Sequence, residues 1–437
     1  MTSLPTVYKI PNSGERESST SKSPSISRLT SIKLDQLGLN DLNSQLLASE
    51  KFRSRLPITD QLKNSHLSSK PQTASLELNQ KLVSQYQQGR IEGRQFGSHE
   101  ERKFTEYSKV DKYGFISETE LSSLNSPEDE KWEKKLKKRE IKWKKMVESW
   151  PRYIKDGHHR KIIVERIYKG LPDSFRAYVW SLFLNLDNFV VPNEYEKLKH
   201  KLLNDPLINV DLHQVDLDIN RTYRNHVMFW ERYGLKQQML FFVLGCYMLY
   251  NPSVGYIQSM AGVAAMLLMY FDEERAFWSL HRLISDTKYD LASCYAEGFP
   301  KLLQEWRLHS SLIQLFLPSL YKKMKNENLN PSDYSSRWFL NCFQEKLPFC
   351  IVVSLWDLFL FNGYIAITIS ALAVVAYLKE HLLTLDYNQA LLLLSHKLVD
   401  YNFDRKKFFK IVDRYAQLVS PRQLDRLARN STSAEHT

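Results

Sequence analysis

Residues 215–260 constrain the fold of this chain more than any other stretch. The middle of the stretch, residues 239–250, is an apolar and aromatic-rich run that favours a buried helix. Polar motifs stand on both sides of this run, with Arg221 before it and Gln258 after it. We interpret Arg221 and Gln258 as two polar groups that a helical scaffold projects toward one site.

The scarcity of glycine supports a helical scaffold. Only 14 of the 437 residues are glycine, which is roughly half of ordinary usage. Few tight β-turns and no phosphate-cradling loop are therefore expected. A hydrophobic fraction of 43% is enough for a real core. The predicted fold class is all-α, with a large helical domain preceded by a mostly disordered N-terminal tail.

Cysteine usage and the apolar stretches favour a cytoplasmic protein without a membrane span. The four cysteines lack CxxC spacing and stand in apolar surroundings, which indicates reduced core thiols with no metal or redox role. Residues 1–11 lack the apolar run of a signal peptide. Polar residues interrupt the apolar stretches 254–271 and 349–378, and a span needs ~18–20 apolar residues. We expect both stretches to form buried helices.

The residues before the domain divide into a tail and a lead-in. Residues 1–100 are rich in polar residues and proline, so they cannot offset the entropy of ordering. We predict a disordered tail with short amphipathic pieces at 34–47 and 76–86, and both a plain and a phosphorylated regulatory tail stay open. Residues 101–168 hold a docking segment at 112–116, whose aromatic pair is expected to pack on a neighbouring surface.

The segment 127–170 carries most of the net charge. It has 15 Lys and Arg residues against 8 Asp and Glu residues, which is +7 of the chain's +11. Its apolar residues recur on one face of a predicted helix, at Trp132, Leu136, Trp143, Val147 and Trp150. The lysines fill the other face, which is either a solvated surface or a contact for an anionic membrane or an acidic partner. Nucleic acid is disfavoured because no recognition motif accompanies the aromatic residues.

Two polar pairs are expected to share helix faces. Arg176 and Trp180 are four residues apart on a helix that Asp173 is expected to cap. Both side chains can therefore stabilise a buried contact between this helix and its neighbours. Asp218 precedes Arg221 by three residues, a spacing that allows the carboxylate to hold the guanidinium.

Other chemistries are excluded by their motifs. A calcium loop beginning at Asp216 would need glycine and an acid where this chain has Arg221 and Val227. A phosphatase-type aspartate pair would need a preceding β-strand, and the context is helical. The sequence contains no GxxxxGK[ST], GxGxxG, HExxH or GxSxG motif. No metal site is predicted.

Three ordered motifs resemble the TBC-domain family, whose members are GTPase-activating proteins for Rab GTPases. Residues 169–172 with Arg176 and Trp180 resemble the first motif. Residues 215–222 resemble IxxDxxRT through Asp218, Arg221 and Thr222, and residues 256–260 resemble YxQGM. Later matches are Trp338, Phe343, Pro348, Trp356, Asp357 and Gly363. The sequences of residues 220–226 and 272–278 are similar to those of the RN-tre branch.

The resemblance implies a TBC core at 169–365 in a domain of two helical lobes, completed by helices at 366–424 and followed by a polar tail at 425–437. It implies that Arg221 is an arginine finger and Gln258 a glutamine finger. The supporting residues would be Asp218, Thr222, Tyr256, Ser259, Arg176 and Trp180. The implied partner is a Rab GTPase in its GTP form, which brings GTP and Mg²⁺, so no cofactor belongs to this chain. Vesicle trafficking at endosomal or Golgi membranes is the implied setting.

One departure from the family pattern keeps a second function open. Ser259 stands where the family has glycine, immediately after Gln258. If that backbone needs a positive φ or a close approach to the GTPase, a Cβ costs about 1–2 kcal/mol. The alternative is therefore a catalytically weak TBC-like module that binds a Rab or another partner as a scaffold.

Overall fold

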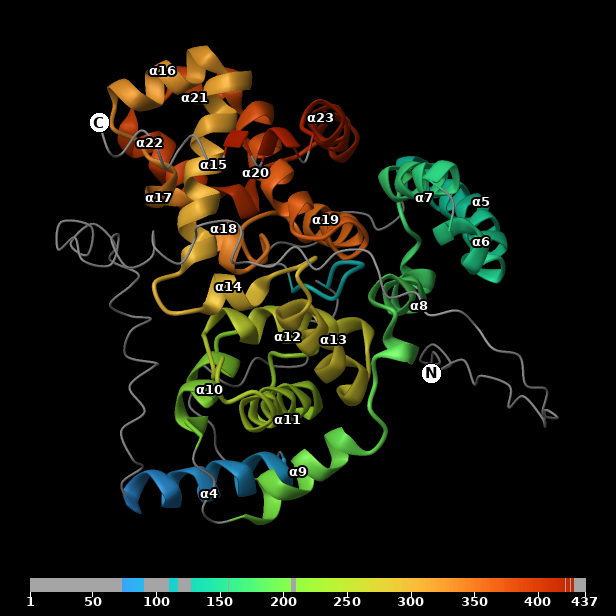
Figure 1. The fold of residues 1–437 in the computed structure, drawn as a ribbon, viewed down its shortest axis with the longest axis vertical. Coiled ribbons are helices and arrows are strands. Elements are labelled where there is room, and N and C mark those ends of the chain that lie inside the picture. The colour runs from blue at the N-terminus through green and yellow to red at the C-terminus, as the bar shows by residue number, and fades with distance from the viewer. Residues whose placement is uncertain are drawn as a thin grey trace. The chain divides into compact units, whose positions relative to one another are not determined.

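The computed structural model describes residues 73–89, 110–116, 127–155, 157–205, 210–420, 422–424 and 426–427. Helices dominate these ranges, and the β-structure within them is limited to two isolated bridges (Figure 1). The prediction of an all-α fold is confirmed. The predicted tail pieces before residue 73 lie outside the described residues.

The helices that lead up to Arg221 and Gln258 come first in the chain. They are α4 (Thr73–Gln88), α5 (Pro127–Glu148), α6 (Trp150–Lys155), α7 (Gly157–Lys169), α8 (Asp173–Leu184), η3 (Leu186–Asn188), α9 (Glu194–Asn204), α10 (Leu212–Ile219), α11 (Leu235–Tyr250) and α12 (Ser259–Tyr270).

The helices after Tyr270 complete the domain. They are α13 (Glu273–Ser285), α14 (Leu291–Tyr295), α15 (Pro300–Phe316), α16 (Pro318–Asn326), α17 (Pro331–Tyr334), α18 (Ser336–Leu340), α19 (Phe349–Asn362), α20 (Ile365–Tyr377), α21 (Lys379–Thr384), α22 (Tyr387–Leu392), η4 (Leu393–Lys397), η5 (Leu398–Asp400) and α23 (Arg405–Leu418).

Helix α11 is the centre of one group of helices. It contacts α4, α9, α10, α12 and α13, and most of its residues are buried. A helix that is apolar all round is stable only when neighbours cover it on every side. The apolar run at 239–250 therefore forms the buried helix that the sequence predicts.

Helices α19 and α20 are the centre of a second group. Helix α20 packs against α15, α18, α19, α21 and α23, and α19 also contacts α7 and α8. Both predicted apolar stretches form buried helices, α12 in the first and α19 with α20 in the second. In the part of the chain that the structure describes, no helix combines the length and apolarity needed to cross a bilayer.

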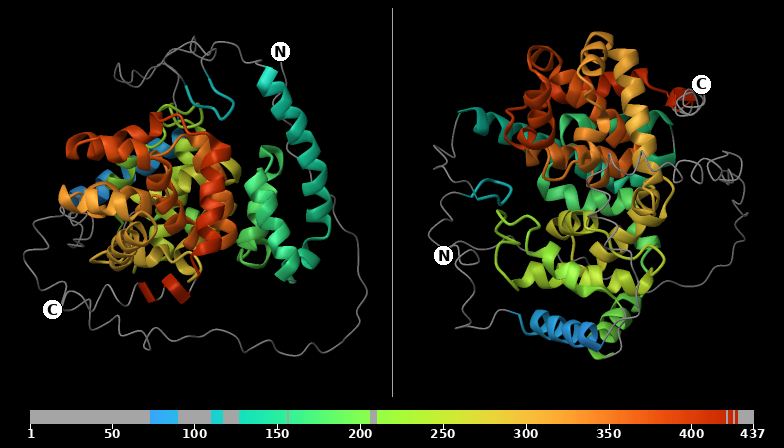
Figure 2. Two further views of the ribbon diagram at one scale, coloured as in Figure 1. Left: turned by 90° about the horizontal axis from the view of Figure 1, so that it is seen from above. Right: turned by 90° about the vertical axis from the view of Figure 1, so that its left-hand side faces the viewer.

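Helix α4 corrects the predicted extent of the tail. It lies within residues 1–100, yet it contacts α9, α10 and α11, as Figure 2 shows for the blue helix. Leu82, Val83 and Tyr86 are buried, and the Tyr86 ring stacks on Phe241 with centroids 4.0 Å apart. The amphipathic piece predicted at 76–86 gains enough apolar contact here to offset its ordering entropy, which composition alone underestimates.

Two helix boundaries also differ from the sequence prediction. The basic helix α5 ends at Glu148, and Trp150 begins α6, because Pro151 cannot donate a helical hydrogen bond to the preceding turn. Trp143 and Trp150 are nevertheless both buried. Asp173 is the first residue of α8 rather than its cap, and its carboxylate pairs with Arg176.

Candidate functional site

Arg221 lies in the turn that ends α10. The backbone N–H of Arg221 donates to the carbonyl of Asp218 at 3.2 Å, and the Thr222 hydroxyl donates to the same carbonyl at 2.7 Å. The first bond closes a tight turn of the 3₁₀ type at the helix C-terminus, and the second reinforces it. Thr222 thereby fixes the backbone from which the Arg221 side chain leaves the helix.

The buried carboxylate of Asp218 connects Arg221 to Tyr256. Arg221 Nε donates to Asp218 Oδ1 at 2.9 Å, and Nη2 also contacts Oδ1. Tyr256 donates its hydroxyl to Oδ2 at 2.7 Å. The Asp218 side chain is 1% exposed, whereas that of Arg221 is 57% exposed. One end of the arginine is thus fixed while much of its guanidinium faces solvent.

Tyr256 is a permanent donor in this cluster. Burial and the neighbouring Asp218 carboxylate raise the pKa of Tyr256 well above its ordinary value. The phenol therefore stays neutral and keeps donating to Asp218 across the physiological range. The negative charge of Asp218 remains available to the guanidinium of Arg221.

Gln258 lies two residues after Tyr256, so the contact between Tyr256 and Asp218 brings the two predicted motifs together. Gln258 is half-buried and is the N-cap residue of α12. Its side-chain amide makes no hydrogen bond to any residue that the structure describes. The amide is therefore available to a group that this chain does not supply.

Ser259 occupies ordinary helical backbone. It is the first residue of α12, is 6% exposed, and is absent from the residues with positive φ. The turn before it is made by Gly255, with φ of 65°. A positive φ at position 259 is therefore not needed, whereas the close approach of Ser259 to a GTPase stays a prediction. The side chain of Ser259 is buried inside the domain.

Arg176 and Trp180 meet at a third residue rather than at each other. Arg176 Nε donates to Asp357 Oδ1 at 3.0 Å, and Trp180 Nε1 donates to the same oxygen at 2.8 Å. Arg176 instead has its cation over the ring of Tyr270, 5.6 Å from the centroid. Arg176, Trp180 and Asp357 are buried and Tyr270 is partly buried, so the cluster joins α8 to α19 inside the domain.

Sequence reasoning missed most of the contacts around the loop that carries Arg221. Residues 110–116 pair with this loop, since Ile116 N donates to Asn225 O at 2.7 Å and Val227 N donates to Gly114 O at 2.9 Å. The Phe115 ring lies 4.8 Å from His226 and 4.8 Å from Phe349, measured between centroids. The aromatic pair at 113 and 115 was the only signal for this contact.

Two more groups hold the same loop. Tyr86 of α4 donates to Asp216 Oδ1 at 2.7 Å, and Arg232 donates to the same carboxylate oxygen. On another side, the Glu345 carboxylate accepts from the backbone N–H of Tyr223 at 3.3 Å. No local sequence pattern links these residues, which lie far apart in the chain.

A metal centre finds no support among the described residues. Within them, no group of three or more His, Cys, Asp or Glu side chains could hold an ion. Three of the four cysteines are buried, and the fourth, Cys350, is partly buried. The side chains that the two motifs offer are the exposed guanidinium of Arg221 and the uncommitted amide of Gln258.

Comparisons with known proteins show what the domain that carries this site resembles. Residues 173–383 match the family model described as the Rab-GTPase-TBC domain, from the first residue of α8 into α21. The chain is 30% identical over 272 residues to mouse TBC1 domain family member 10B, covering 61% of this chain and 32% of that protein. It is 31% identical over 270 residues to mouse TBC1 domain family member 10A, covering 61% and 52%.

The resemblance to the TBC domain is thus confirmed for residues 173–383, while the RN-tre branch stays a prediction. The chain spans about a third to a half of the length of these curated relatives. Among solved structures, it is similar to the TBC domain of a Chlamydomonas flagellar RabGAP, with a TM-score of 0.52 and 23% identity. That match covers 69% of this chain and 99% of the other, and it supports the fold alone.

Proposed function

We propose that this protein is a GTPase-activating protein for a Rab GTPase, with Arg221 and Gln258 as its catalytic groups. The observation that carries the proposal is the cluster around Asp218. An arginine that is 57% exposed is held by a carboxylate that is 1% exposed, and Tyr256 ties the segment of Gln258 to the same carboxylate. The match of residues 173–383 to the Rab-GTPase-TBC domain supports the partner class.

Arg221 would stabilise charge that develops during GTP hydrolysis. The transition state spreads negative charge over the transferring and leaving oxygens, and a guanidinium supplied in trans lowers its energy. An arginine finger raises the rate by about 10³–10⁵-fold. Since Asp218 already fixes Arg221 in the free protein, less conformational entropy is lost when the guanidinium enters the partner's site.

Gln258 would position the attacking water. A side-chain amide both donates and accepts hydrogen bonds, so it can bridge a water and a phosphate oxygen. The N-cap position on α12 gives the side chain a rigid base, and the amide is uncommitted among the described residues. GTP and Mg²⁺ belong to the partner, and we propose no cofactor for this chain.

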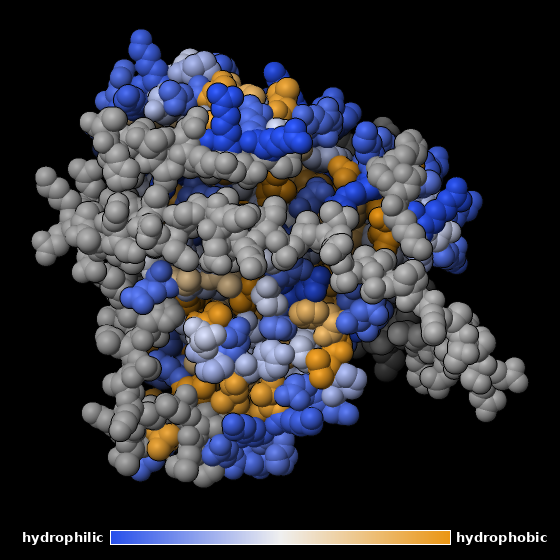
Figure 3. Space-filling view, viewed as in Figure 1, coloured by the Kyte–Doolittle hydropathy of each residue, from blue (hydrophilic) through white to orange (hydrophobic). Residues whose placement is uncertain are grey.

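Exposed apolar side chains on α10, on the loop that carries Arg221 and at the start of α11 offer contacts to a partner. Leu217, Met228 and Leu235 are 48%, 41% and 66% exposed. Leu217 lies on the last turn of α10, directly before the turn that carries Arg221. Apolar side chains reach the surface in the lower half of Figure 3, the region of α10 and α11 in Figure 1. A protein partner would bury these side chains.

We further propose a cytoplasmic protein that acts on vesicle trafficking at endosomal or Golgi membranes. The support is the similarity of residues 220–226 and 272–278 to the RN-tre branch, together with the basic face of α5. Its exposed lysines, which attract anionic lipid headgroups, include Lys137, Lys138, Lys144 and Lys145. Salt-sensitive binding to anionic vesicles that disappears when these lysines are neutralised tests this contact.

Single-turnover GTP hydrolysis across a panel of Rab GTPases tests the proposal. We expect at least one Rab to be accelerated by the full chain, and Arg221→Ala to lower that acceleration by about 10³-fold or more. Arg275→Ala is the matched control, because its guanidinium pairs with Asp187 away from the proposed site. If no Rab is accelerated and Ser259→Gly restores activity, the scaffold alternative replaces the catalytic one.

A further inference from the structure

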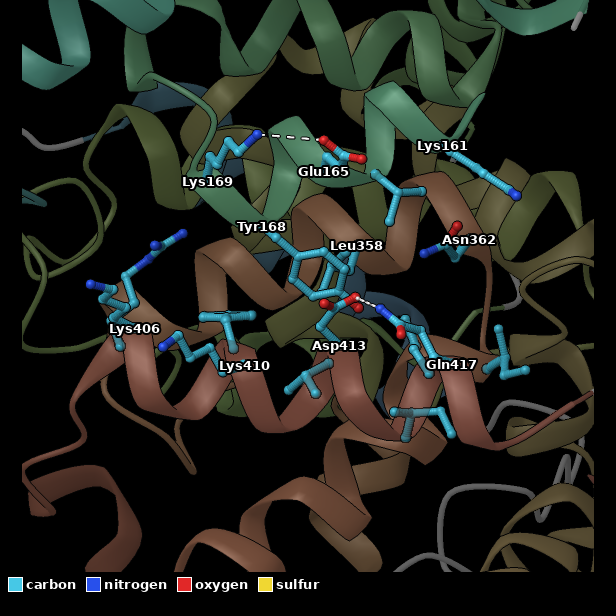
Figure 4. Close-up of a pocket in the computed structure, with 18 of the residues that line it drawn as sticks. Lys161, Glu165, Tyr168, Lys169, Leu358, Asn362, Lys406, Lys410, Asp413 and Gln417 are labelled. Carbon is cyan, nitrogen blue, oxygen red and sulfur yellow. Dashed lines mark hydrogen bonds and ion pairs between the residues drawn. The ribbon is translucent and has the colours of Figure 1, made fainter. Parts of the chain in front are cut away.

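A groove of about 1330 Å³ lies on another surface of the domain, between α7 and α23. Figure 4 shows the two helices facing each other, with Lys161, Glu165, Tyr168 and Lys169 on one wall. The side chains of Lys406, Lys410, Asp413 and Gln417 form the other wall. None of these residues belongs to the cluster around Arg221.

The groove is strongly cationic. Eight of its lining side chains are Lys or Arg, against two carboxylates, Glu165 and Asp413. Both carboxylates are already engaged: Lys169 Nζ lies 3.5 Å from Glu165, and Gln417 Nε2 donates to Asp413 at 3.1 Å. Positive charge on both walls therefore exceeds what the groove itself neutralises.

Three lysines of the groove can form ion pairs with a partner. Lys161, Lys406 and Lys410 are exposed, and none forms an ion pair within the described part of the chain. Crowding among the cations is also visible at Gly170, where the guanidiniums of Arg139 and Arg405 converge. Burial and the charge of Arg405 lower the pKa of Arg139.

The floor of the groove is apolar. It is formed by side chains of α7, α19, α20 and α23, among them Val164, Leu358, Ile365, Ile369 and Val412. An apolar floor between two cationic walls matches an amphipathic segment with apolar residues on one face and acidic residues on its flanks.

We propose that this groove binds an acidic amphipathic segment of a partner protein. Its volume exceeds the ~300–1,000 Å³ of pockets for small ligands. A bilayer surface is flat and cannot enter a concave groove between two helices, whereas a helix about 10 Å wide can lie in one. Apolar contact with the floor and ion pairs with Lys161, Lys406 and Lys410 hold the segment. The proposal does not depend on the activity assigned to Arg221.

Fluorescence anisotropy with the full chain tests the groove. The probe is a labelled amphipathic helix of about 18 residues, five turns long, with leucines on one face and glutamates beside them. We expect saturable binding that Lys406→Glu with Lys410→Glu weakens at least about tenfold, or 1.4 kcal/mol. Ala416→Trp, which narrows the groove without changing its charge, should weaken binding similarly.

Two controls separate a built groove from general attraction between opposite charges. Lys322→Glu with Lys325→Glu makes the same charge change on α16, outside the groove, and should leave the affinity within about twofold. The thermal midpoint of each variant confirms folding. The proposal is overturned if both charge pairs weaken the probe equally or Ala416→Trp has no effect. It is also overturned if Lys406 and Lys410 are needed for anionic vesicles and not for the peptide.

Discussion

Asp218 joins two segments that lie 38 residues apart, through one bond to Tyr256 and a pair of contacts to Arg221. A buried carboxylate is stable only when its charge is compensated. In this protein the compensation comes from a neutral donor and from an arginine that faces solvent. The residue that determines where Arg221 points is therefore buried behind it.

Tyr256→Phe tests this arrangement because it removes a single oxygen atom. The change removes a 2.7 Å hydrogen bond to Asp218 and should lower the unfolding free energy by about 1.5–3 kcal/mol. We expect stimulated GTP hydrolysis by the folded protein to fall roughly tenfold, because Asp218 can then rotate and misplace Arg221. Tyr289→Phe is the control, since it loses a 2.7 Å bond to Leu360 O far from Arg221 in sequence. Equal activity losses in both variants would contradict the account.

Ser259→Gly addresses the departure from the family pattern. Because Ser259 begins α12 with helical backbone, glycine brings no relief of strain and loses helix propensity. We expect an unfolding free energy lower by up to about 0.5 kcal/mol and stimulated hydrolysis within about twofold of the natural chain. A large gain in activity would show that the Cβ of Ser259 obstructs the partner.

At the scale of elements, the loop between α10 and α11 is irregular yet held from three sides. Residues 110–116 pair with it, Tyr86 of α4 accepts a hydrogen bond from Arg232 near its end, and Glu345 accepts from Tyr223. Two of these supports lie before residue 173, where the family match begins. Residues 173–383 alone therefore lack two of the contacts that hold the loop carrying Arg221.

Gly114→Ala tests the support from residues 110–116. Gly114 has φ of +96°, and a Cβ there would lie 2.7 Å from Nε2 of His226. We expect the segment to detach, with a loss of about 1–3 kcal/mol and a larger fall in kcat than rise in KM for the Rab. Gly170→Ala, at φ +114° against flexible arginine side chains, is the matched control. An unchanged kcat in Gly114→Ala would show that residues 110–116 do not help to position Arg221.

The sequence predicts local features of this fold better than distant ones. The run at 239–250 and the three-residue spacing of Asp218 and Arg221 carry their own periodicity, so the helix and the contact follow from short-range geometry. The contacts of Asp218 with Tyr256, and of Tyr86 with Asp216, span 38 and 130 residues. Such pairs depend on packing that no local pattern encodes, which is why α4 resembled part of a tail.

At the scale of the whole molecule, one buried histidine makes stability depend on pH. His309 of α15 is fully buried, and its Nε2 lies 3.0 Å from the Tyr334 hydroxyl. Burial lowers the pKa of His309 to about 3, against about 6.5 in an unfolded chain. Between these values the unfolded state binds the additional proton. The stability that neutral His309 contributes is present above about pH 6.5 and lost as the pH falls.

Urea unfolding at several pH values tests this linkage. The natural chain should lose about 1.4 kcal/mol per pH unit below pH 6.5 through His309 alone. His309→Gln should lack that part of the slope, while the exposed His213→Gln should retain it. Identical slopes in all three proteins would show that His309 does not remain neutral in the fold.

The most direct test of the central claim is binding of a responsive Rab in two nucleotide states. One is the GDP–aluminium fluoride complex, which mimics the transition state, and the other is a non-hydrolysable GTP analogue. If Arg221 and Gln258 act on the transition state, the full chain should bind the mimic at least about 100-fold more tightly. Arg221→Ala and Gln258→Ala should abolish that preference. Equal affinity for both states, unchanged by either substitution, would contradict the catalytic account.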